Sequence, residues 1–372
     1  MKFSRPFLSG VIFPLWMIFV GASIQACSSD SSPSRAEPES QYALGTICTV
    51  NLFEEGTIEL YAKAFGRIHE LEEILSANKD GTDLDRVNKN AGLEAIKVRP
   101  ELIEVLEIAY YFAEKSGGSF DPSIGPLVKL WGIGSGEERI PGEEEIREAQ
   151  KQIDYRKIEI NQKEKTVFLR RAGMALDLGA IAKGYAADEV VKLLRREGVE
   201  RAIIDLGGDI FAMGEKNINK SSIEVFTRLL PGREKKTDND ETYWRIGIQD
   251  PRDERGSYIG ILRVKNKSVV TSGIYERFFE ENGKRYHHIF SAESGYPVEN
   301  GLLSVTIVAE SSIDADALST TVFVLGWEGG RDLIADINGA EGIFVFDDLT
   351  VRLTENLEDD FFLTAAEYRL AE

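Results

Sequence analysis

The residues best suited to chemistry lie between Met174 and Asp188, in the sequence MALDLGAIAKGYAAD. Asp177 and Gly179 follow an apolar run and precede a stretch with helical periodicity, which predicts a strand-to-helix junction. The start of a helix exposes unpaired N–H groups and carries a positive partial charge, so it favours phosphate. Lys183 adds a cation one turn into the helix. The same pattern is also typical of an ordinary helix start with a surface lysine.

A second pair of candidate residues is Asp316 and Thr320. They are four positions apart in a predicted helix and therefore share one face. A carboxylate and a hydroxyl are hard oxygen ligands that suit Mg²⁺, which keeps water ligands and shares phosphate oxygens. For an isolated pair, the more common explanation is a helix cap, for which Ser312 and Asp314 are candidates, together with a hydroxyl bonded to the backbone.

Three further stretches could line a ligand site. His287 and His288 are adjacent in a predicted strand, so they should face opposite ways and only one should enter a given site. Gly207-Gly208 ends an apolar strand, where a ligand can approach the backbone closely. Residues Ser119–Glu138 interleave glycine and proline with Phe and Trp, which predicts either a wall for a flat ligand or turns packed on a core.

The chain has 372 residues and a formal net charge of −19, with only two cysteines and three histidines. This length allows one large domain or two ordinary ones. The acidic balance argues against nucleic acid as a partner, because binding nucleic acid requires many phosphate contacts from cations. The cysteine and histidine counts exclude a Cys/His metal cluster. An anionic nucleotide can still bind where local cations or a metal offset the charge.

The N-terminus reads as an export signal. Basic residues precede the apolar run Phe7–Ala22, and Ala26 precedes Cys27. Residues 1–27 are therefore predicted to be a lipoprotein signal peptide with lipid on Cys27, and residues 28–41 a disordered polar tether. A transmembrane anchor is the alternative, but the run is short and Pro14 interrupts it. Cys48 would then be a buried thiol without a partner.

Periodicity and turn residues predict the elements that position these candidates. We expect strands, helices and loops at the following places: a strand at Tyr42–Leu52; helices at Glu59–Ala77 and Pro100–Lys115; a polar loop at Ser76–Asn88; an irregular segment at Ser119–Glu138; a small helix and a hairpin in 141–172; a strand at Arg201–Phe211; several strands in 222–272, with an exposed insertion at Glu234–Glu241; a hairpin turn at Asn282-Gly283; a strand at Leu302–Glu310; and strands and a short helix at the end.

Several stretches, taken together and in order, resemble the ApbE family of flavin transferases. They run from about Tyr42 to the C-terminus: LGT at 44–46, SANKDGTDLDRVN, SGGSFDPSIGPLVKLWG, DLGAIAKGYAAD, IIDLGGDI, WRIGIQDP, VVTSGIYERFF with GKRYHHI, and ADALSTTVFVLG. Each motif is weak alone, but their order over more than 300 residues is specific.

The resemblance implies an α+β fold with mixed sheets flanked by helices, T-fold-like, in one domain over 42–372. It implies a Mg²⁺-dependent transferase that cleaves the FAD pyrophosphate, joins FMN to a Thr or Ser hydroxyl of a target protein and releases AMP. The implied partners are flavin-accepting subunits of membrane redox complexes. The implied location is the periplasmic side of the inner membrane, with a lipid anchor in that membrane.

The family's site residues carry over to matching positions here. FAD is implied to contact Leu44, Asn78, Ser119, Phe120, Asp121, Asp177, Lys183, His288 and Ile289. Mg²⁺ is implied to bind the backbone oxygen of Ala180 and the side chains of Asp316 and Thr320. His288 is the candidate general base. Two positions depart from the family pattern: Ser291-Ala292 replace a usual Asp-Pro pair, and Asn78 replaces a frequent aromatic residue.

Two other functions stay open. With water in place of the acceptor, the same site would be a Mg²⁺-dependent FAD pyrophosphatase. A protein that only binds FAD is the alternative of a different class, a non-catalytic periplasmic lipoprotein. The presence of Asp316 and Thr320 favours catalysis over binding alone.

Overall fold

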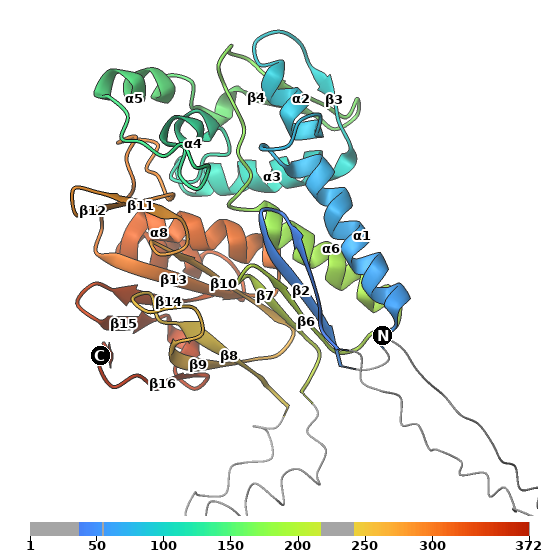
Figure 1. Cartoon of the computed structure of the whole chain (residues 1–372), viewed down its shortest axis with the longest axis vertical. Coiled ribbons are helices and arrows are strands. Elements are labelled where there is room, and N and C mark those ends of the chain that lie inside the picture. The colour runs from blue at the N-terminus through green and yellow to red at the C-terminus, as the bar shows by residue number, and fades with distance from the viewer. Residues whose placement is uncertain (1–36, 54–55, 217–241, 372) are drawn as a thin grey trace, which may run out of the picture. The chain divides into compact units, whose positions relative to one another are not determined.

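A nine-stranded sheet organises the structure, a computed structural model that describes residues 37–53, 56–216 and 242–371 (Figure 1). Adjacent strands in the order β1-β2-β6-β7-β10-β13-β14-β15-β17 are antiparallel, except for the parallel pair β15 and β17. The strands are β1 (Glu39–Ala43), β2 (Thr46–Leu52), β6 (Ala202–Leu206), β7 (Ile210–Met213), β10 (Lys267–Gly273), β13 (Leu302–Ala309), β14 (Glu341–Phe346), β15 (Thr350–Leu353) and β17 (Arg369–Leu370).

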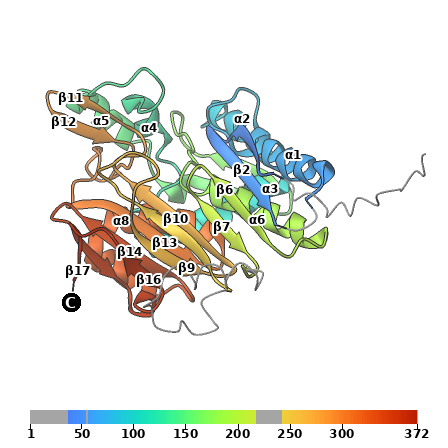
Figure 2. The ribbon, with the colours of Figure 1, turned by 60° about the horizontal axis from the view of Figure 1, so that its bottom comes forward.

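Helices cover one face of this sheet and a small sheet covers the other (Figures 1 and 2). Helices α6 (Ala182–Arg196) and α8 (Ser312–Ala335) pack on the strands, and α1 (Ile58–Leu75) and α3 (Pro100–Lys115) pack on these helices. The small sheet has the order β16-β9-β8. Its strands are β8 (Trp244–Gln249), β9 (Tyr258–Val264) and β16 (Phe361–Leu363). Alternating apolar residues of both sheets form a second core between them.

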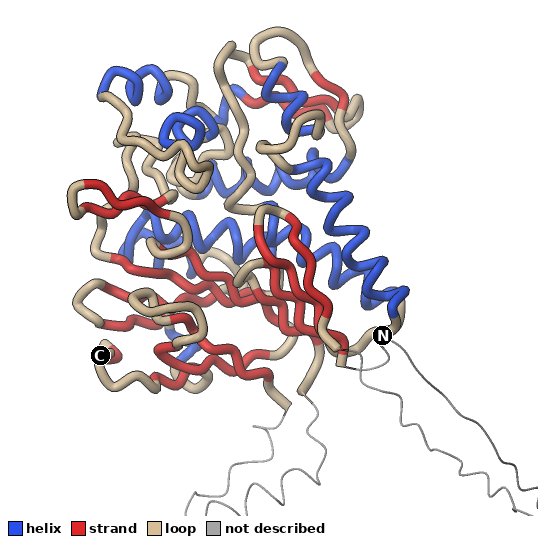
Figure 3. The backbone as a smooth tube through the Cα atoms, in the orientation of Figure 1, coloured by secondary structure: helices blue, strands red, loops and turns tan. Residues whose placement is uncertain are grey.

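A layer of shorter elements lies beyond α3 and α8 (Figure 3). These elements are α2 (Asp83–Lys89), α4 (Gly125–Trp131), α5 (Glu143–Gln150), the short helix η1 (Tyr155–Lys157), the sheet of β3 (Ile96–Lys97), β4 (Ile158–Asn161) and β5 (Thr166–Leu169), and the hairpin of β11 (Phe278–Glu281) and β12 (Lys284–His287). Trp131 is fully buried and contacts Phe290, which joins α4 to the segment after β12. The layer therefore brings the chain after β12 close to the loop around α4.

Most predicted elements are confirmed, including the α+β class, both long helices and the hairpin turn at Asn282-Gly283. The single strand predicted at Tyr42–Leu52 is wrong, because Leu44 and Gly45 adopt positive φ angles of 52° and 73° and turn the chain between β1 and β2. Strand β1 also begins at Glu39, inside the range predicted as a tether. Cys48 is free and buried, as expected.

The other differences come from local signals that were missed. The polar loop contains α2, which Thr82 caps by accepting a hydrogen bond from Asp85 N–H at 3.0 Å. The irregular segment contains α4, because Pro126 stands in its first turn, where proline is tolerated. Ser311 caps α8 instead of the predicted residues. After the short helix η3 (Glu355–Leu357), two strands follow that were not predicted.

The part of the predicted strand region 222–272 before residue 242, with its insertion at Glu234–Glu241, lies outside the described residues, as do the signal peptide, Cys27 and most of the tether. No helix in the described ranges is both long and apolar enough to cross a membrane.

Candidate functional site

The turn before α6 is held by Asp177. Its N–H donates to the Pro122 carbonyl at 2.9 Å, and its Oδ1 accepts the Gly179 N–H at 2.8 Å. Burial raises the pKa of this carboxyl, and the Gly179 bond and the charge of Arg277 act against that rise. Instead of the strand predicted before this turn, the structure has a single β-bridge between Ala175 and Ile124. The turn therefore connects the loop before α4 to the start of α6.

Lys183, in the first turn of α6, forms an ion pair with the buried carboxylate of Asp209. Burial lowers the pKa of the Lys183 ammonium, but the charges of Asp209 and Asp316 outweigh it and leave the pKa above its usual value. Burial also raises the pKa of Asp209 to about 7, with Lys183 opposing the rise and Asp316 adding to it. The predicted cation is thus already paired, with a residue to which the sequence analysis gave no role.

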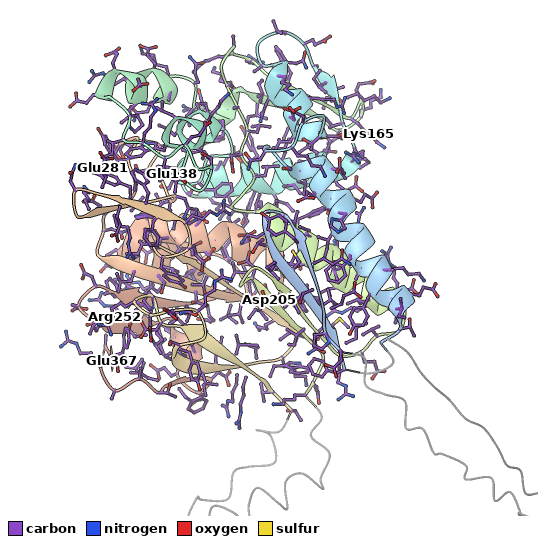
Figure 4. The ribbon with its side chains drawn as sticks, in the orientation of Figure 1. Glu138, Lys165, Asp205, Arg252, Glu281 and Glu367 are labelled. Atoms are coloured by element: carbon purple, nitrogen blue, oxygen red, sulfur yellow. The ribbon has the colours of Figure 1, made fainter. Side chains whose placement is uncertain are left out.

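Asp209 is placed by a tight turn between β6 and β7. Gly207 and Gly208 adopt φ angles of 74° and 104°, which L-residues rarely take. The Gly208 N–H donates to Asp205 Oδ1 at 2.7 Å; Asp205 is labelled in Figure 4. A Cβ on Gly207 would lie only 2.3 Å from Thr46 Oγ1, so β2 follows this turn closely. The start of β2 therefore lies against the turn that precedes Asp209.

Asp316 and Thr320 lie on one face of α8, as their spacing predicts. Asp316 is only 3% exposed, and its Oδ2 accepts the Gly184 N–H at 2.9 Å. Burial raises its pKa, while Lys183 and backbone N–H groups of α6 act against the rise. Thr320 Oγ1 lies 3.2 Å from Ser272 Oγ at the end of β10. Strand β10, α6 and α8 therefore meet at these side chains.

The two histidines have different surroundings, and only His287 lies within β12. His287 is buried against Phe323, and its Nε2 lies 2.9 Å from the Val298 carbonyl. The Arg277 carbonyl accepts the backbone N–H of His288 at 3.1 Å and lies 3.2 Å from its Nδ1. Because a carbonyl can only accept, Nδ1 carries the proton and Nε2 keeps its lone pair. Burial, helped by the charge of Arg277, lowers the pKa of His288 to about 3, so the imidazole is neutral.

Arg277 is a second site residue that the sequence analysis missed. Its charge lowers the pKa of His288 and opposes the burial-driven rise in the pKa of Asp177 and Asp316. Its side chain passes Gly134, where a Cβ would lie 3.2 Å from Arg277 Cδ. Within the described part of the chain it forms no ion pair at 4.0 Å or less. Among the described residues, Arg277 thus has no carboxylate partner within 4.0 Å, whereas the half-buried Lys183 is paired with Asp209.

This arrangement can be compared with known proteins. A model of the ApbE family matches residues 44–344 of the chain, and this range holds all the side chains placed above. The chain belongs to the ApbE family. It is 38% identical over 335 residues to the FAD:protein FMN transferase of Treponema pallidum, with 88% of each protein covered. It is 33% identical over 314 residues to that of Klebsiella pneumoniae, covering 84% of this chain and 90% of the relative.

Solved structures of ApbE proteins have the same fold. The ApbE protein of Thermotoga maritima aligns with a TM-score of 0.70 and 31% identity, covering 84% of this chain and 94% of that one. The apo flavinyl transferase ApbE of Pseudomonas stutzeri gives a TM-score of 0.67 at 28% identity, covering 88% and 93%.

The remaining positions carried over to this ApbE-family chain lie on loops and differ in exposure. Asn78 is exposed just after α1, with its N–H bonded to Ser76 Oγ at 3.2 Å. The N–H of Leu44 donates to Glu72 Oε1 at 2.7 Å, which holds a leucine at an unfavourable positive φ. Such strain clusters at functional sites.

The segment Ser119–Asp121 follows α3 and is fixed from inside the protein. Phe120 is 5% exposed. Asp121 accepts hydrogen bonds from Ser123 N–H at 2.8 Å, Ser123 Oγ at 2.6 Å and Tyr155 N–H at 3.1 Å. Ile289, beside His288, is 3% exposed. The backbone N–H groups of Phe120 and Ile289 are also bonded within the protein, to Ser116 Oγ at 3.0 Å and to His287 Nδ1 at 3.3 Å.

Proposed function

We propose that this protein transfers FMN from FAD to a Thr or Ser hydroxyl of a target protein and releases AMP. The observation that carries the proposal is the charge cluster at the start of α6, where Lys183, Asp209, Asp316 and Arg277 act on one another. A helix start with two cations suits a pyrophosphate. Relatives that share most of the chain's length are named FAD:protein FMN transferase.

The donor set fits Mg²⁺. Asp316 supplies one buried carboxylate, Thr320 a hydroxyl on the same helix face, and Ala180 a backbone carbonyl just before α6. Among the described residues no three His, Cys, Asp or Glu side chains form a metal cage. A set with one carboxylate suits an ion that keeps waters and takes phosphate oxygens. Such an ion would neutralise the pyrophosphate and stabilise the leaving AMP.

The protein groups have separate tasks in the reaction. The acceptor hydroxyl oxygen forms a bond to the FMN phosphorus, and the bond from that phosphorus to the bridging oxygen breaks. AMP leaves with that oxygen, and the hydroxyl proton passes to Nε2 of His288. The neutral imidazole is ready to accept it, and an anionic substrate nearby raises the low pKa of His288 toward a useful value. Lys183 and Arg277 hold the phosphates in place.

The test is to incubate the purified protein with FAD, MgCl₂ and a candidate acceptor, and then to weigh the acceptor. We expect its mass to increase by one FMN less water, at a single Thr or Ser, with an equal amount of AMP. FMN and AMP without a modified acceptor would instead identify a FAD pyrophosphatase. FAD that binds but stays intact with every acceptor and metal would identify a binding lipoprotein.

Membrane attachment through Cys27 is part of the proposal. The basic residues, the apolar run Phe7–Ala22 and the Ala26-Cys27 junction suggest that the mature chain begins at Cys27 on the periplasmic side of the inner membrane. Mass spectrometry of protein purified from membranes should find a lipid-modified Cys27 at the N-terminus. An intact Met1, or an unmodified Cys27 in that sample, would contradict this. The acceptor would then be a flavin-bearing subunit of a membrane redox complex.

Asn78 should limit how tightly FAD binds. Its exposed amide follows α1 on a polar loop, at a position where the family resemblance implies an aromatic ring. Asn78→Tyr should bind FAD more tightly by roughly 1–3 kcal/mol, as stacking on nucleic acid bases does. Hydrolysis should slow, because tighter ground-state binding that is not matched in the transition state raises the barrier. Calorimetry measures the affinity, and FMN release measures the rate.

The control is Asn338→Tyr, which adds the same ring to an exposed asparagine after α8. It should leave affinity and rate unchanged. If Asn78→Tyr behaves like this control, Asn78 does not touch the nucleotide and its loop is only a surface connection.

A further inference from the structure

Helices α6 and α8 are joined by hydrogen bonds in addition to the packing of their side chains. Asp188, in α6, points its carboxylate at the first residues of α8. Its Oδ1 accepts the Ser312 N–H at 2.9 Å and its Oδ2 the Ile313 N–H at 3.0 Å, and Ser311 Oγ donates to Oδ2 at 3.2 Å. The first N–H groups of a helix have no partner within it, and charged acceptors bind them strongly.

A second contact runs the other way. Asp316 of α8 accepts the Gly184 N–H, in the first turn of α6, at 2.9 Å. Each helix thus places a carboxylate on N–H groups at the start of the other, and we refer to the bonds of Asp188 and Asp316 as the reciprocal contacts. The backbones approach so closely between them that a Cβ on Gly184 would lie 2.2 Å from the Ser312 carbonyl oxygen. Sliding or rotating one helix would break both contacts.

The proposed metal ligands stand on both sides of the reciprocal contacts. Ala180 precedes α6, while Asp316 and Thr320 lie in the first turns of α8. A site shared by two helices is only as accurate as the position of one helix on the other, and errors near 1 Å matter.

Asp188 adds a second set of capping bonds to α8, and these come from another helix. Ser311 already caps α8 by accepting the Asp314 N–H at 3.3 Å. A half-buried carboxylate at this place has a cost, since partial burial raises the pKa of Asp188 despite its hydrogen bonds. A neutral residue would bind one N–H group with a smaller desolvation cost. The carboxylate of Asp188 is charged and binds two N–H groups at once, so it fixes the distance and orientation between the two helices.

We infer that Asp188 is a positioning residue for the metal site, which sets α8 against α6 so that Ala180, Asp316 and Thr320 converge on one cation. This rests on the proposed function, because it assumes that these three residues hold the metal. It predicts that replacing Asp188 weakens metal binding more than the loss of a helix cap alone would.

The test uses the purified full chain and measures Mn²⁺ binding by electron paramagnetic resonance. ADP is present because it supplies a pyrophosphate group but contains no FMN that could be transferred. Asp188→Asn keeps the size of the side chain but places an NH₂ group against one of the two N–H donors. Outer-shell partners of metal sites are worth about 10- to 100-fold in affinity, so the Mn²⁺ affinity should fall by that factor. The Mg²⁺ concentration for half-maximal FAD cleavage should rise in parallel, with the maximal rate largely recovered at high Mg²⁺.

Ser311→Ala is the matched control. It weakens the same helix start but leaves the Asp188 bonds to Ser312 and Ile313 N–H in place. It should lower the melting temperature without changing Mn²⁺ affinity. Asp188→Glu is the second variant, in case the asparagine variant does not fold. It keeps the charge and the capping but displaces α8 by one methylene group, so it should fold and bind Mn²⁺ at least several-fold more weakly.

Each result has one meaning. If Asp188→Asn or Asp188→Glu is folded and binds Mn²⁺ as the unchanged protein does, Asp188 is merely structural and the inference is wrong. If the two variants lose affinity only as much as Ser311→Ala does, the same conclusion holds. If the unchanged protein binds no Mn²⁺ with ADP and cleaves no FAD, the proposed function fails, and the inference fails with it.

Discussion

Replacing Asp316 with alanine is expected to abolish measurable FAD cleavage while the protein stays folded. Asp316 is the only charged residue among the proposed metal ligands, and it is almost fully buried. A catalytic metal contributes several kcal/mol of transition-state stabilisation, so its loss should reduce the rate by roughly three orders of magnitude or more. The fold should survive, because burial already disfavours this charge and raises its pKa. FMN release and a melting curve measure the two effects.

Two further variants separate charge from shape. Asp316→Asn keeps an oxygen for the Gly184 N–H but has no charge, and we expect it to be nearly as inactive as the alanine variant. Asp314→Asn removes the same charge two residues earlier in α8, and it should stay active. Substantial Mg²⁺-dependent FMN release by folded Asp316→Ala protein would contradict the assignment of the metal site.

Gly184→Ala is expected to destabilise the protein by about 3 kcal/mol or more, or to prevent folding. The added Cβ would lie 2.2 Å from the Ser312 carbonyl oxygen, 2.6 Å from its carbon and 2.7 Å from Ile313 Cα. These are backbone atoms of α8, so they cannot move aside as a flexible side chain can. Overpacking of a core costs about 1–3 kcal/mol and occasionally more, and here it also separates the Gly184 N–H from Asp316.

The control for this prediction is Gly66→Ala, in the middle of α1. No atom lies within 4 Å of the Cβ that it would add, so alanine should stabilise that helix by about 0.5–1 kcal/mol. Urea unfolding of both variants against the unchanged protein measures the two free energies. Equal stability of the two variants would mean that α6 and α8 do not approach each other as closely as the structure shows.

Local sequence signals predicted the parts of the fold that local interactions decide. The apolar periodicity of α1 and α3 predicts both helices, and Asn282-Gly283 predicts the β11–β12 turn. The turn at Leu44 could not be predicted, because leucine disfavours a positive φ and the supporting bond comes from Glu72, 28 residues away. At this turn, a contact between distant residues overrides the local preference.

The residues of the candidate site were also only partly predictable from the sequence. The spacing of Asp316 and Thr320 and the helix start before Lys183 are visible in the sequence, and the structure places Lys183 and Asp316 close enough to act on each other's pKa. The partner of Lys183 was not visible, because Asp209 is 26 residues away on another element. Arg277 was also missed, since nothing in its own stretch shows that it stands beside His288.

The bond between Gly184 and Asp316 joins residues 132 positions apart. Closing so long a stretch of chain has a high entropic cost, and non-local contacts of this kind slow folding. The proposed metal site can therefore form only after α8 has been synthesised and has docked on α6. A chain that crosses a membrane unfolded would carry no such site during its passage. If the chain is exported unfolded, as proposed above, it would therefore not cleave FAD in the compartment where it is synthesised.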